Sequence, residues 1–213
     1  MDFQRARTKE QIGTRENEIV SACIKLYSEK GYDGVSLMAI SKLTSITRPS
    51  IYNYFKTKGE IFMEILSRDY LDWIRELEKA LDSEDRLTRS EYCHILTKTI
   101  IHRERMLRLI SMNLREMEDD STVERIAGFK TVIVSLLELI SESIVKFFPE
   151  TSAEEKDTFI SLFLTFLFGL YTYTHPTEKQ IEAMEIIGLS LVIDMETICY
   201  EGLLKLSSGL IEE

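Results

Sequence analysis

The residues best suited to chemistry lie close together, in the stretch that runs from Thr47 to Lys58. Polar side chains with hydrogen-bond donors are expected on the outer face of a short helix there: Arg48, Ser50, Asn53 and Lys56. Ile51 and Phe55 would point inward from the same helix. Such donors bind base edges and phosphate oxygens, so the segment is a candidate for contact with double-stranded DNA.

Two helices precede this segment and must position it. Thr14 can cap a helix over residues 14–30, and Gly31 stands where a left-handed residue commonly ends a helix. Ser36 can cap a second helix, about two turns long, that ends near residue 43.

A turn at residues 44–46 then leads into the third helix. Either Thr47 or Arg48 opens that helix, with Pro49 in its first turn, where a missing N–H costs nothing. Two short helices joined by a tight turn are typical of a helix-turn-helix, whose second helix lies in the major groove.

The rest of the chain also predicts helices and no strands. Thr57 and Glu60 form a capping-box pattern at the start of a long amphipathic helix that ends near residue 81. Further helices are predicted between polar interruptions, at residues 90–101, 103–118, 122–148, 153–174 and 178–208. We therefore predict an all-α fold, with a helix-turn-helix domain at 1–58 and a helical bundle domain at 59–213.

Charge is divided unevenly between these two parts. The chain carries a net charge of -10, yet residues 1–58 hold ten basic and six acidic residues, a balance of +4, and the remainder carries -14. This asymmetry would direct the N-terminal part toward a polyanion such as DNA. Compositional drift between two segments is the alternative explanation.

Other site chemistry is not suggested by the sequence. His94, His102 and His175 lack the spacing to other ligands that a metal site or a catalytic triad requires, and no glycine-rich phosphate loop follows a strand. Three cysteines, each set among apolar neighbours, are expected in the core: Cys23, Cys93 and Cys199. We expect no enzyme, no cofactor and no metal.

The location of the protein follows from the absence of long apolar runs. No stretch has the length of a signal peptide or of a membrane-spanning helix, so we expect a cytoplasmic protein that does not enter a membrane.

Residues 14–66 resemble the N-terminal domain of the tetracycline-repressor (TetR) family of bacterial transcription regulators. The resemblance rests on the string SLMAISKLTSITRPSIYNYFKTKGEIF, from Ser36 to Phe62, and on apolar and aromatic residues before it: Ile19, Ala22, Leu26, Tyr27 and Tyr32. It implies a homodimer on a palindromic operator and a C-terminal domain that binds a small effector.

The resemblance also implies which residues touch DNA. By position, five residues would contact phosphate: Ser36, Thr47, Tyr52, Tyr54 and Lys58. Four others would face bases: Arg48, Pro49, Ser50 and Asn53. The sequence departs from the family pattern at Ser41, Ser45 and Pro49, where a family member usually has Ala, Gly and a small residue. Ser45 must therefore adopt a left-handed conformation or reshape the turn, at a cost on the order of 1 kcal/mol.

Aromatic and methionine residues concentrate in the C-terminal part, where they form either a packed core or an effector cavity. The predicted effector residues are Tyr70, Trp73, Tyr92, Thr99, His102, Met106, Asn113, Phe129, Phe163, Phe166 and Tyr171. Such a pocket would suit an apolar or flat aromatic compound.

The last two predicted helices are apolar over more than one face, which a monomer could not hide from water. Gly169, Gly188 and Gly202 lie within them, and close approach of a second helix would compensate for glycine there. We predict a homodimer through roughly residues 154–208.

The sequence thus favours a ligand-responsive transcriptional regulator, most simply a repressor. The alternative is an effector-free DNA-bound structural or interaction protein that recruits a protein partner through its acidic surface.

Overall fold

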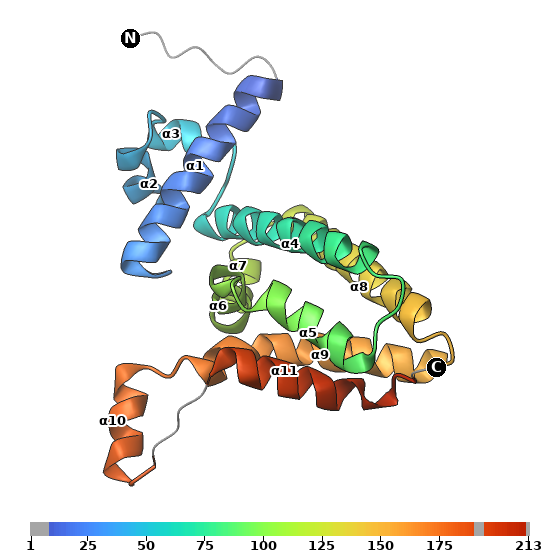
Figure 1. The fold of residues 1–213 in the computed structure, drawn as a ribbon. Coiled ribbons are helices and arrows are strands. Elements are labelled where there is room, and N and C mark those ends of the chain that lie inside the picture. Colours follow the sequence, from blue (N-terminus) through green and yellow to red (C-terminus); the bar gives the residue numbers. More distant parts are fainter. Residues whose placement is uncertain (1–8, 190–193, 212–213) are drawn as a thin grey trace. The chain divides into compact units, whose positions relative to one another are not determined.

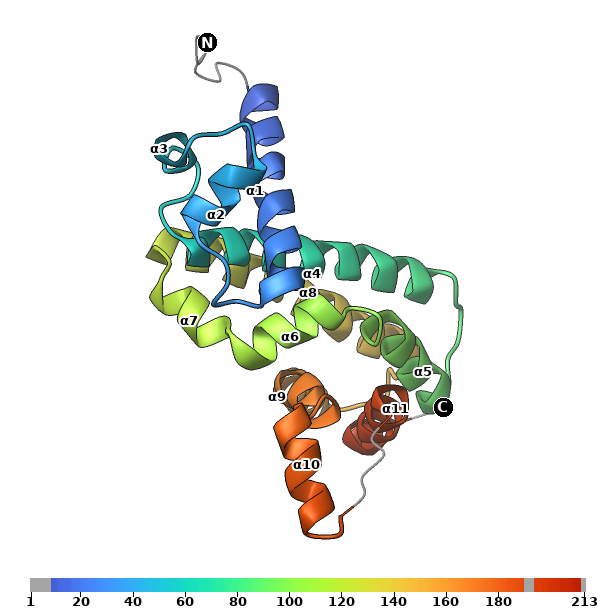
Figure 2. The same cartoon turned by 90° about the vertical axis from the view of Figure 1, so that its left-hand side faces the viewer.

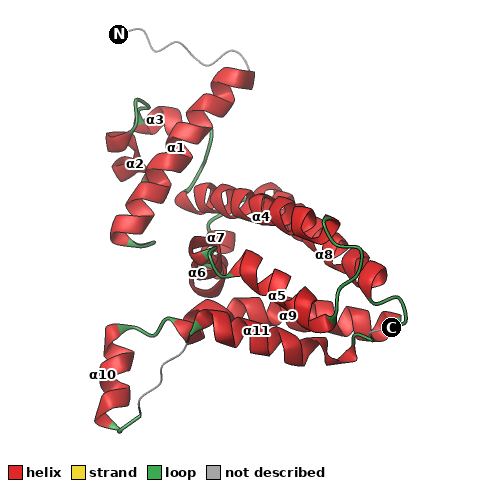
Figure 3. Cartoon of the chain, viewed as in Figure 1, coloured by secondary structure: helices red, strands yellow, loops and turns green. Residues whose placement is uncertain are grey.

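A computed structural model describes residues 9–189 and 194–211 of the chain (Figure 1). These residues form eleven α-helices and one short 3-10 helix, joined by turns and loops, with no strand in the described ranges (Figure 3). The predicted all-α fold is confirmed.

The helices belong to two compact units. The first unit combines Met1–Arg68 with Asn113–Lys130, and the second combines Asp69–Met112 with Thr131–Glu213. Two long helices, α4 (Lys58–Asp82) and α8 (Val123–Phe147), contribute residues to both units.

The first unit begins with α1 (Lys9–Lys30), α2 (Leu37–Leu43) and α3 (Arg48–Ile51). Helix α2 contacts both α1 and α3 (Figure 2). The unit's other members are the start of α4, α7 (Leu114–Asp119) and the start of α8. Several apolar side chains with no exposed surface form its core: Ile19, Cys23, Ile40, Ile51, Phe55 and Phe62. Burial of this set is what fixes α3 against the rest of the unit.

Local capping explains where these helices begin and end. Gly31 has φ 68° and its N–H donates to the carbonyl of Tyr27, as predicted for the end of α1. The Ser36 hydroxyl accepts the N–H of Ala39 at 3.1 Å, which confirms Ser36 as the cap of α2. Thr47 is the residue that precedes α3, so Arg48 is its first helical residue.

Two predicted caps differ in the structure. Thr14 does not begin α1, because the helix already runs from Lys9 and the Thr14 hydroxyl donates to the Glu10 carbonyl within it. At the start of α4, the Thr57 hydroxyl accepts the N–H of Glu60, but the Glu60 carboxylate accepts the N–H of Lys56 and not that of Thr57. The first hydrogen bond of the predicted capping box is thus present, whereas in the second one Glu60 accepts from the residue before Thr57.

The second unit contains α5 (Arg89–Ile100), α6 (Glu104–Met112), α9 (Ala153–Thr174), α10 (Glu178–Ile186), α11 (Met195–Leu206) and the 3-10 helix Ser207–Gly209, together with most of α4 and α8. Helix α9 packs on α6 and α11, and α11 also packs on α5 (Figure 2). The core is rich in buried aromatic residues: Tyr70, Trp73, Tyr92, Phe148, Phe159 and Phe163.

Two predicted helices are interrupted. The helix expected at 103–118 is broken at Asn113, whose backbone leaves the helical region, and continues as α6 and α7. The helix expected at 178–208 ends at Ile186, and Gly188 follows with φ 74°, a left-handed conformation that stops a helix. Asp194 then caps α11 through the N–H of Thr197 at 2.8 Å.

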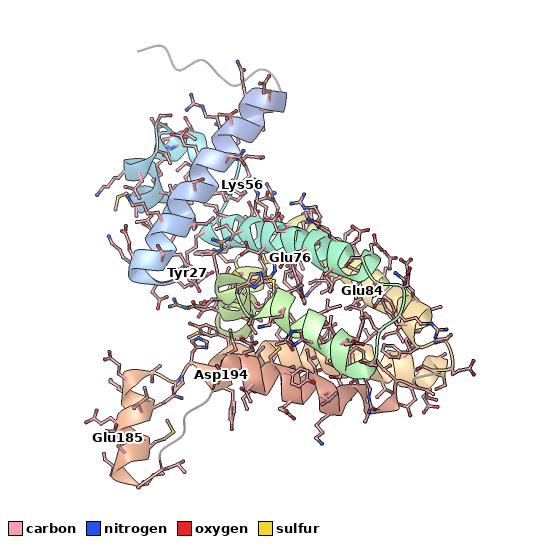
Figure 4. The ribbon with its side chains drawn as sticks, viewed as in Figure 1. Tyr27, Lys56, Glu76, Glu84, Glu185 and Asp194 are labelled. Atoms are coloured by element: carbon pink, nitrogen blue, oxygen red, sulfur yellow. The ribbon has the colours of Figure 1, made fainter. Side chains whose placement is uncertain are left out.

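The interruption leaves α10 projecting from α9 and α11 in both ribbon views (Figures 1 and 2). Glu185 on α10 and Asp194 at the start of α11 mark the two sides of the connection (Figure 4). Within the described residues, no helix has the length and apolar character needed to span a lipid bilayer.

Candidate nucleic-acid interface

Helix α3 presents a polar face outward and an apolar face inward. Arg48, Pro49 and Asn53 are exposed, whereas Ile51 and Phe55 have no exposed surface. Backbone hydrogen bonds from Asn53, Tyr54 and Phe55 continue the helical turn beyond the four residues of α3. A short, rigidly seated element with donors on its free side is what insertion into a DNA groove requires.

Side chains on this face contact one another. The hydroxyls of Thr47 and Ser50 lie 2.9 Å apart, and the Arg48 guanidinium donates to the Tyr52 hydroxyl at 3.4 Å. Tyr52 is 38% exposed, so part of this residue is accessible to a ligand. The structure therefore brings four of the predicted contact residues into two pairs, Thr47 with Ser50 and Arg48 with Tyr52.

The predicted phosphate contacts at the edges of this surface have partners within the chain. The Ser36 hydroxyl caps α2, which leaves its own hydrogen available to donate. The Lys58 ammonium lies 4.0 Å from the centre of the Tyr32 ring and 3.4 Å from the Tyr32 carbonyl. A cation that stacks on a ring in this way is held in place, with less freedom to lose on binding an anion.

Charge and burial shape the neighbourhood of Lys58. Burial raises the pKa of the Tyr32 hydroxyl, and the carboxylates of Asp120 and Glu116 raise it further. Burial also raises the pKa of the Cys23 thiol to about 12, although the Lys58 charge opposes that shift. Cys23 is thus a neutral core residue, as predicted.

The other two cysteines are also buried and free, which confirms their predicted place in the core. Burial raises the pKa of Cys93, and it raises the pKa of Cys199 to about 12. No cluster of three or more His, Cys, Asp or Glu side chains that could hold a metal occurs in the ranges that the structure describes.

Three residues that support the interface were not identified from the sequence. Glu18 on α1 holds the turn before α3, and Asp120 and Arg125 bind the segment that follows α3. Glu18 lies on α1, and Asp120 lies in the polar stretch between α7 and α8. No local sequence signal distinguishes these carboxylates and this guanidinium from ordinary surface charges.

The predicted effector residues are mostly core residues in the second unit. The Trp73 indole donates to the Thr99 hydroxyl at 3.2 Å, and the Tyr92 and Ser143 hydroxyls lie 2.7 Å apart. His102 is exposed and pairs with Glu76, while Asn113 and Phe129 belong to the first unit. Their role in binding an effector stays a prediction.

Two surface hollows of the second unit are lined by other residues. One of about 440 Å³ lies between α5 and Tyr200 of α11, and one of about 400 Å³ lies between α8 and the start of α9. The hydroxyls of Ser90 and Tyr200 are 2.8 Å apart in the first of these.

Comparison with known families matches nearly the whole chain. The family described as bacterial regulatory proteins, tetR family, matches residues 19–65. The family described as the tetracyclin repressor-like C-terminal domain matches residues 67–213.

Two individual relatives are also transcriptional regulators. The biofilm operon icaADBC HTH-type negative transcriptional regulator IcaR of Staphylococcus aureus is 26% identical over 77% of this chain and 86% of its own length. The HTH-type transcriptional regulator AcrR of Shigella flexneri is 30% identical over 47% of this chain and 49% of its own length.

Solved structures share the fold at lower identity. The fatty acid degradation regulator FadR of Bacillus halodurans has a TM-score of 0.60 at 14% identity and covers 98% of this chain and 100% of its own. FadR of Bacillus subtilis, solved with stearoyl-CoA, has a TM-score of 0.62 at 15% identity. The match covers 92% of this chain and 99% of the FadR chain.

Proposed function

The chain belongs to the TetR family and is a transcriptional regulator of that family, and we propose that it is a ligand-responsive repressor that binds a palindromic operator as a homodimer. The observation that carries this proposal is the seating of α3. Its polar side chains from Thr47 to Asn53 are turned outward, while Ile51 and the following Phe55 are fully buried.

Roles for the individual residues follow from their positions. Arg48 and Asn53 lie on the exposed side of α3 and would read bases, with Pro49 and Ser50 beside them. Phosphate would be bound at the edges of the surface, by Ser36, Thr47, Tyr52, Tyr54 and Lys58. The balance of +4 over residues 1–58 supports this placement.

Homodimerisation through residues 154–208 is supported by exposed apolar side chains on α9. Leu162 and Phe168 are 43% and 42% exposed, an unfavourable arrangement for an isolated chain in water. Gly169 leaves open space beside its Cα, so a second helix could approach closely there. A two-fold dimer places two identical α3 helices on two half-sites, hence a palindromic operator.

An apolar or aromatic effector is proposed for the second unit. The rings of Trp73 and Phe163 lie 6.2 Å apart and those of Phe159 and Phe163 lie 5.9 Å apart, so an apolar compound would find aromatic contacts on entering this core. Effector binding would shift α4 and thereby change the spacing of the reading helices, which needs only a few kcal/mol of differential affinity. FadR of Bacillus subtilis, a fold relative, was solved with stearoyl-CoA, which makes a long-chain acyl-CoA a sensible first probe.

An effector-free structural protein is the second candidate. The hydrogen bond that Trp73 donates to Thr99 and the one between the Tyr92 and Ser143 hydroxyls favour it, because a filled core with satisfied polar atoms needs no ligand.

Footprinting of the DNA that flanks the chain's own coding region tests the proposal. We expect protection of a palindrome at physiological salt, and release of the DNA by an apolar compound that also changes the fluorescence of Trp73, the single tryptophan. Salt-sensitive binding without a protected palindrome would refute the repressor. A protected palindrome that no apolar or aromatic compound releases would favour the structural protein.

A further inference from the structure

A distant segment of the chain closes the first unit against the end of α3. This segment comprises α7 and the first residues of α8, and it lies about sixty residues after α3 in the sequence. Asp120 anchors it, because its side chain accepts the N–H of Gly59 at 3.0 Å and its carbonyl accepts the Thr57 hydroxyl.

The fit between the segment and the start of α4 is close. A Cβ atom on Gly59 would lie 2.8 Å from the Met117 carbonyl oxygen and 2.9 Å from the Asp120 Cβ. Glycine is thus required at this position by contact with the segment, since its φ is ordinary for any residue.

Arg125 binds the helical turn that follows α3. Its guanidinium donates to the Tyr54 carbonyl at 3.0 Å and lies 5.1 Å from the centre of the Phe55 ring. The last carbonyls of a helical turn have no partner within the helix, and a cation near them is favourable for the helix dipole. Arg125 therefore supplies a hydrogen-bond donor and a positive charge to the carbonyl end of this short helix.

A chain of charged groups fixes Arg125 from its other side. Glu64 on α4 lies 3.8 Å from the Arg125 guanidinium and 2.7 Å from that of Arg68, which in turn donates to Asn17 on α1 at 2.7 Å. The Arg125 side chain is 35% exposed, so its charge is partly shielded from salt.

From these contacts we propose that Arg125 is a positioning residue for DNA recognition, which holds the exposed side of α3 at the orientation that reads bases. Helix α3 has only four residues, too few to be stable by itself, so its orientation depends on the contacts at its two ends. Base readout by hydrogen bonds tolerates little displacement, whereas phosphate attraction is long-ranged. Loss of Arg125 should therefore weaken specific binding far more than nonspecific binding.

The inference rests on the proposed function, and its test separates positioning from direct contact. The full-length chain and its Arg125→Ala, Arg125→Lys and Arg115→Ala variants are titrated with the footprinted duplex and with a scrambled duplex of equal composition, at several salt concentrations. Arg115 is the control, because it lies in the same segment, carries the same charge and is 95% exposed.

For Arg125→Ala we expect about tenfold weaker binding to the specific duplex, the loss typical of one charge-assisted hydrogen bond, with nonspecific affinity and salt slope unchanged. Arg125→Lys keeps a cation and a donor, so it should recover part of the specificity. Arg115→Ala should match the wild type. A salt slope reduced by about one in Arg125→Ala would instead indicate phosphate contact and overturn the proposal. Specific affinity within twofold of the wild type would also overturn it.

A measurement without DNA keeps the two proposals separate. Amide hydrogen exchange over residues 48–55 should be faster in Arg125→Ala than in Arg115→Ala. The two variants are compared under conditions in which urea unfolding gives them the same global stability. Failure of the wild type to discriminate the duplexes would refute the proposed function alone. Equal exchange in the two variants would refute the positioning of α3 whatever the DNA result.

Discussion

The carboxylate of Glu18, on α1, accepts the backbone N–H of Ser45 in the turn between α2 and α3. Its second oxygen lies 3.1 Å from the Ser45 hydroxyl and 3.2 Å from the Arg15 guanidinium. Members of the family usually have glycine at the position of Ser45, and in this chain no described residue other than glycine has a positive φ. The turn is therefore formed without a left-handed residue and is held by the Glu18 side chain.

Glu18 should make stability depend on pH. Burial disfavours its charge, but the hydrogen bonds from Ser45 and Arg15 outweigh that effect and lower the pKa of Glu18 below its ordinary value of 4.5. A lowered pKa contributes stability that is complete above 4.5 and is lost as pH falls through the folded-state value. Glu18→Gln should therefore reduce the free energy of unfolding at pH 7 by less than about 1 kcal/mol, because solvent screens these partly exposed groups, and the gap should close below pH 4.5.

Urea unfolding of both chains at pH 7 and at acid pH measures this difference. Glu29→Gln, an exposed residue of the same helix, serves as the control and should show no such gap. A gap that stays constant across pH would contradict an ionic contribution from Glu18.

Three of the helix caps were predictable because each depends on a few consecutive residues. Gly31, Ser36 and Thr57 each interact with backbone groups three or four residues away, so a local pattern is sufficient to identify them. The outward polar face of α3 was predictable for the same reason, since Ile51 and Phe55 show helical spacing.

Contacts between distant residues were not predictable from the pattern. Ile186 and Ile187 continue the apolar spacing of α10, which conceals the break at Gly188. Asp120 and Arg125 come into contact with the end of α3 and the start of α4 only through the fold. A charged residue in a polar stretch has the same local appearance whether it faces water or anchors another segment.

Two glycines of the first unit should respond in opposite ways to alanine. Gly59→Ala places a methyl group 2.8 Å from a backbone oxygen of Met117, so it should destabilise the chain by about 1–3 kcal/mol. Gly13→Ala, inside α1, meets nothing within 4 Å and should stabilise by about 0.5–1 kcal/mol through helix propensity. Urea midpoints of the two variants measure both effects. If both variants were destabilised, the space beside each glycine would not be what decides whether alanine raises or lowers the free energy of unfolding.

The proposed dimer predicts a specific sensitivity on α9. Phe168→Glu places a charge on a side chain that is 42% exposed and is proposed to be covered by a second copy, so the dimer should dissociate. Val123→Glu, at a position 77% exposed and outside residues 154–208, is the matched control and should remain dimeric. Sedimentation velocity over a concentration series distinguishes the two. A Phe168→Glu chain with the wild-type sedimentation coefficient would place the interface elsewhere.

Arg48 and Lys58 should separate base reading from phosphate binding. Arg48 is exposed on α3 and would contact a base edge, so Arg48→Ala should reduce the ratio of specific to nonspecific affinity by about 1–3 kcal/mol in free energy. Lys58 is half-buried on the Tyr32 ring at the edge of the surface. Lys58→Ala should weaken binding to every duplex alike and reduce the salt slope by about one, and loss of the ring contact should lower stability by about 0.5–1 kcal/mol. Anisotropy titrations with specific and scrambled duplexes at several salt concentrations, beside urea unfolding, measure all three quantities. The opposite pattern, with Lys58 controlling sequence preference and Arg48 only the salt slope, would mean that the surface docks on DNA with its edge and not with α3 in the groove.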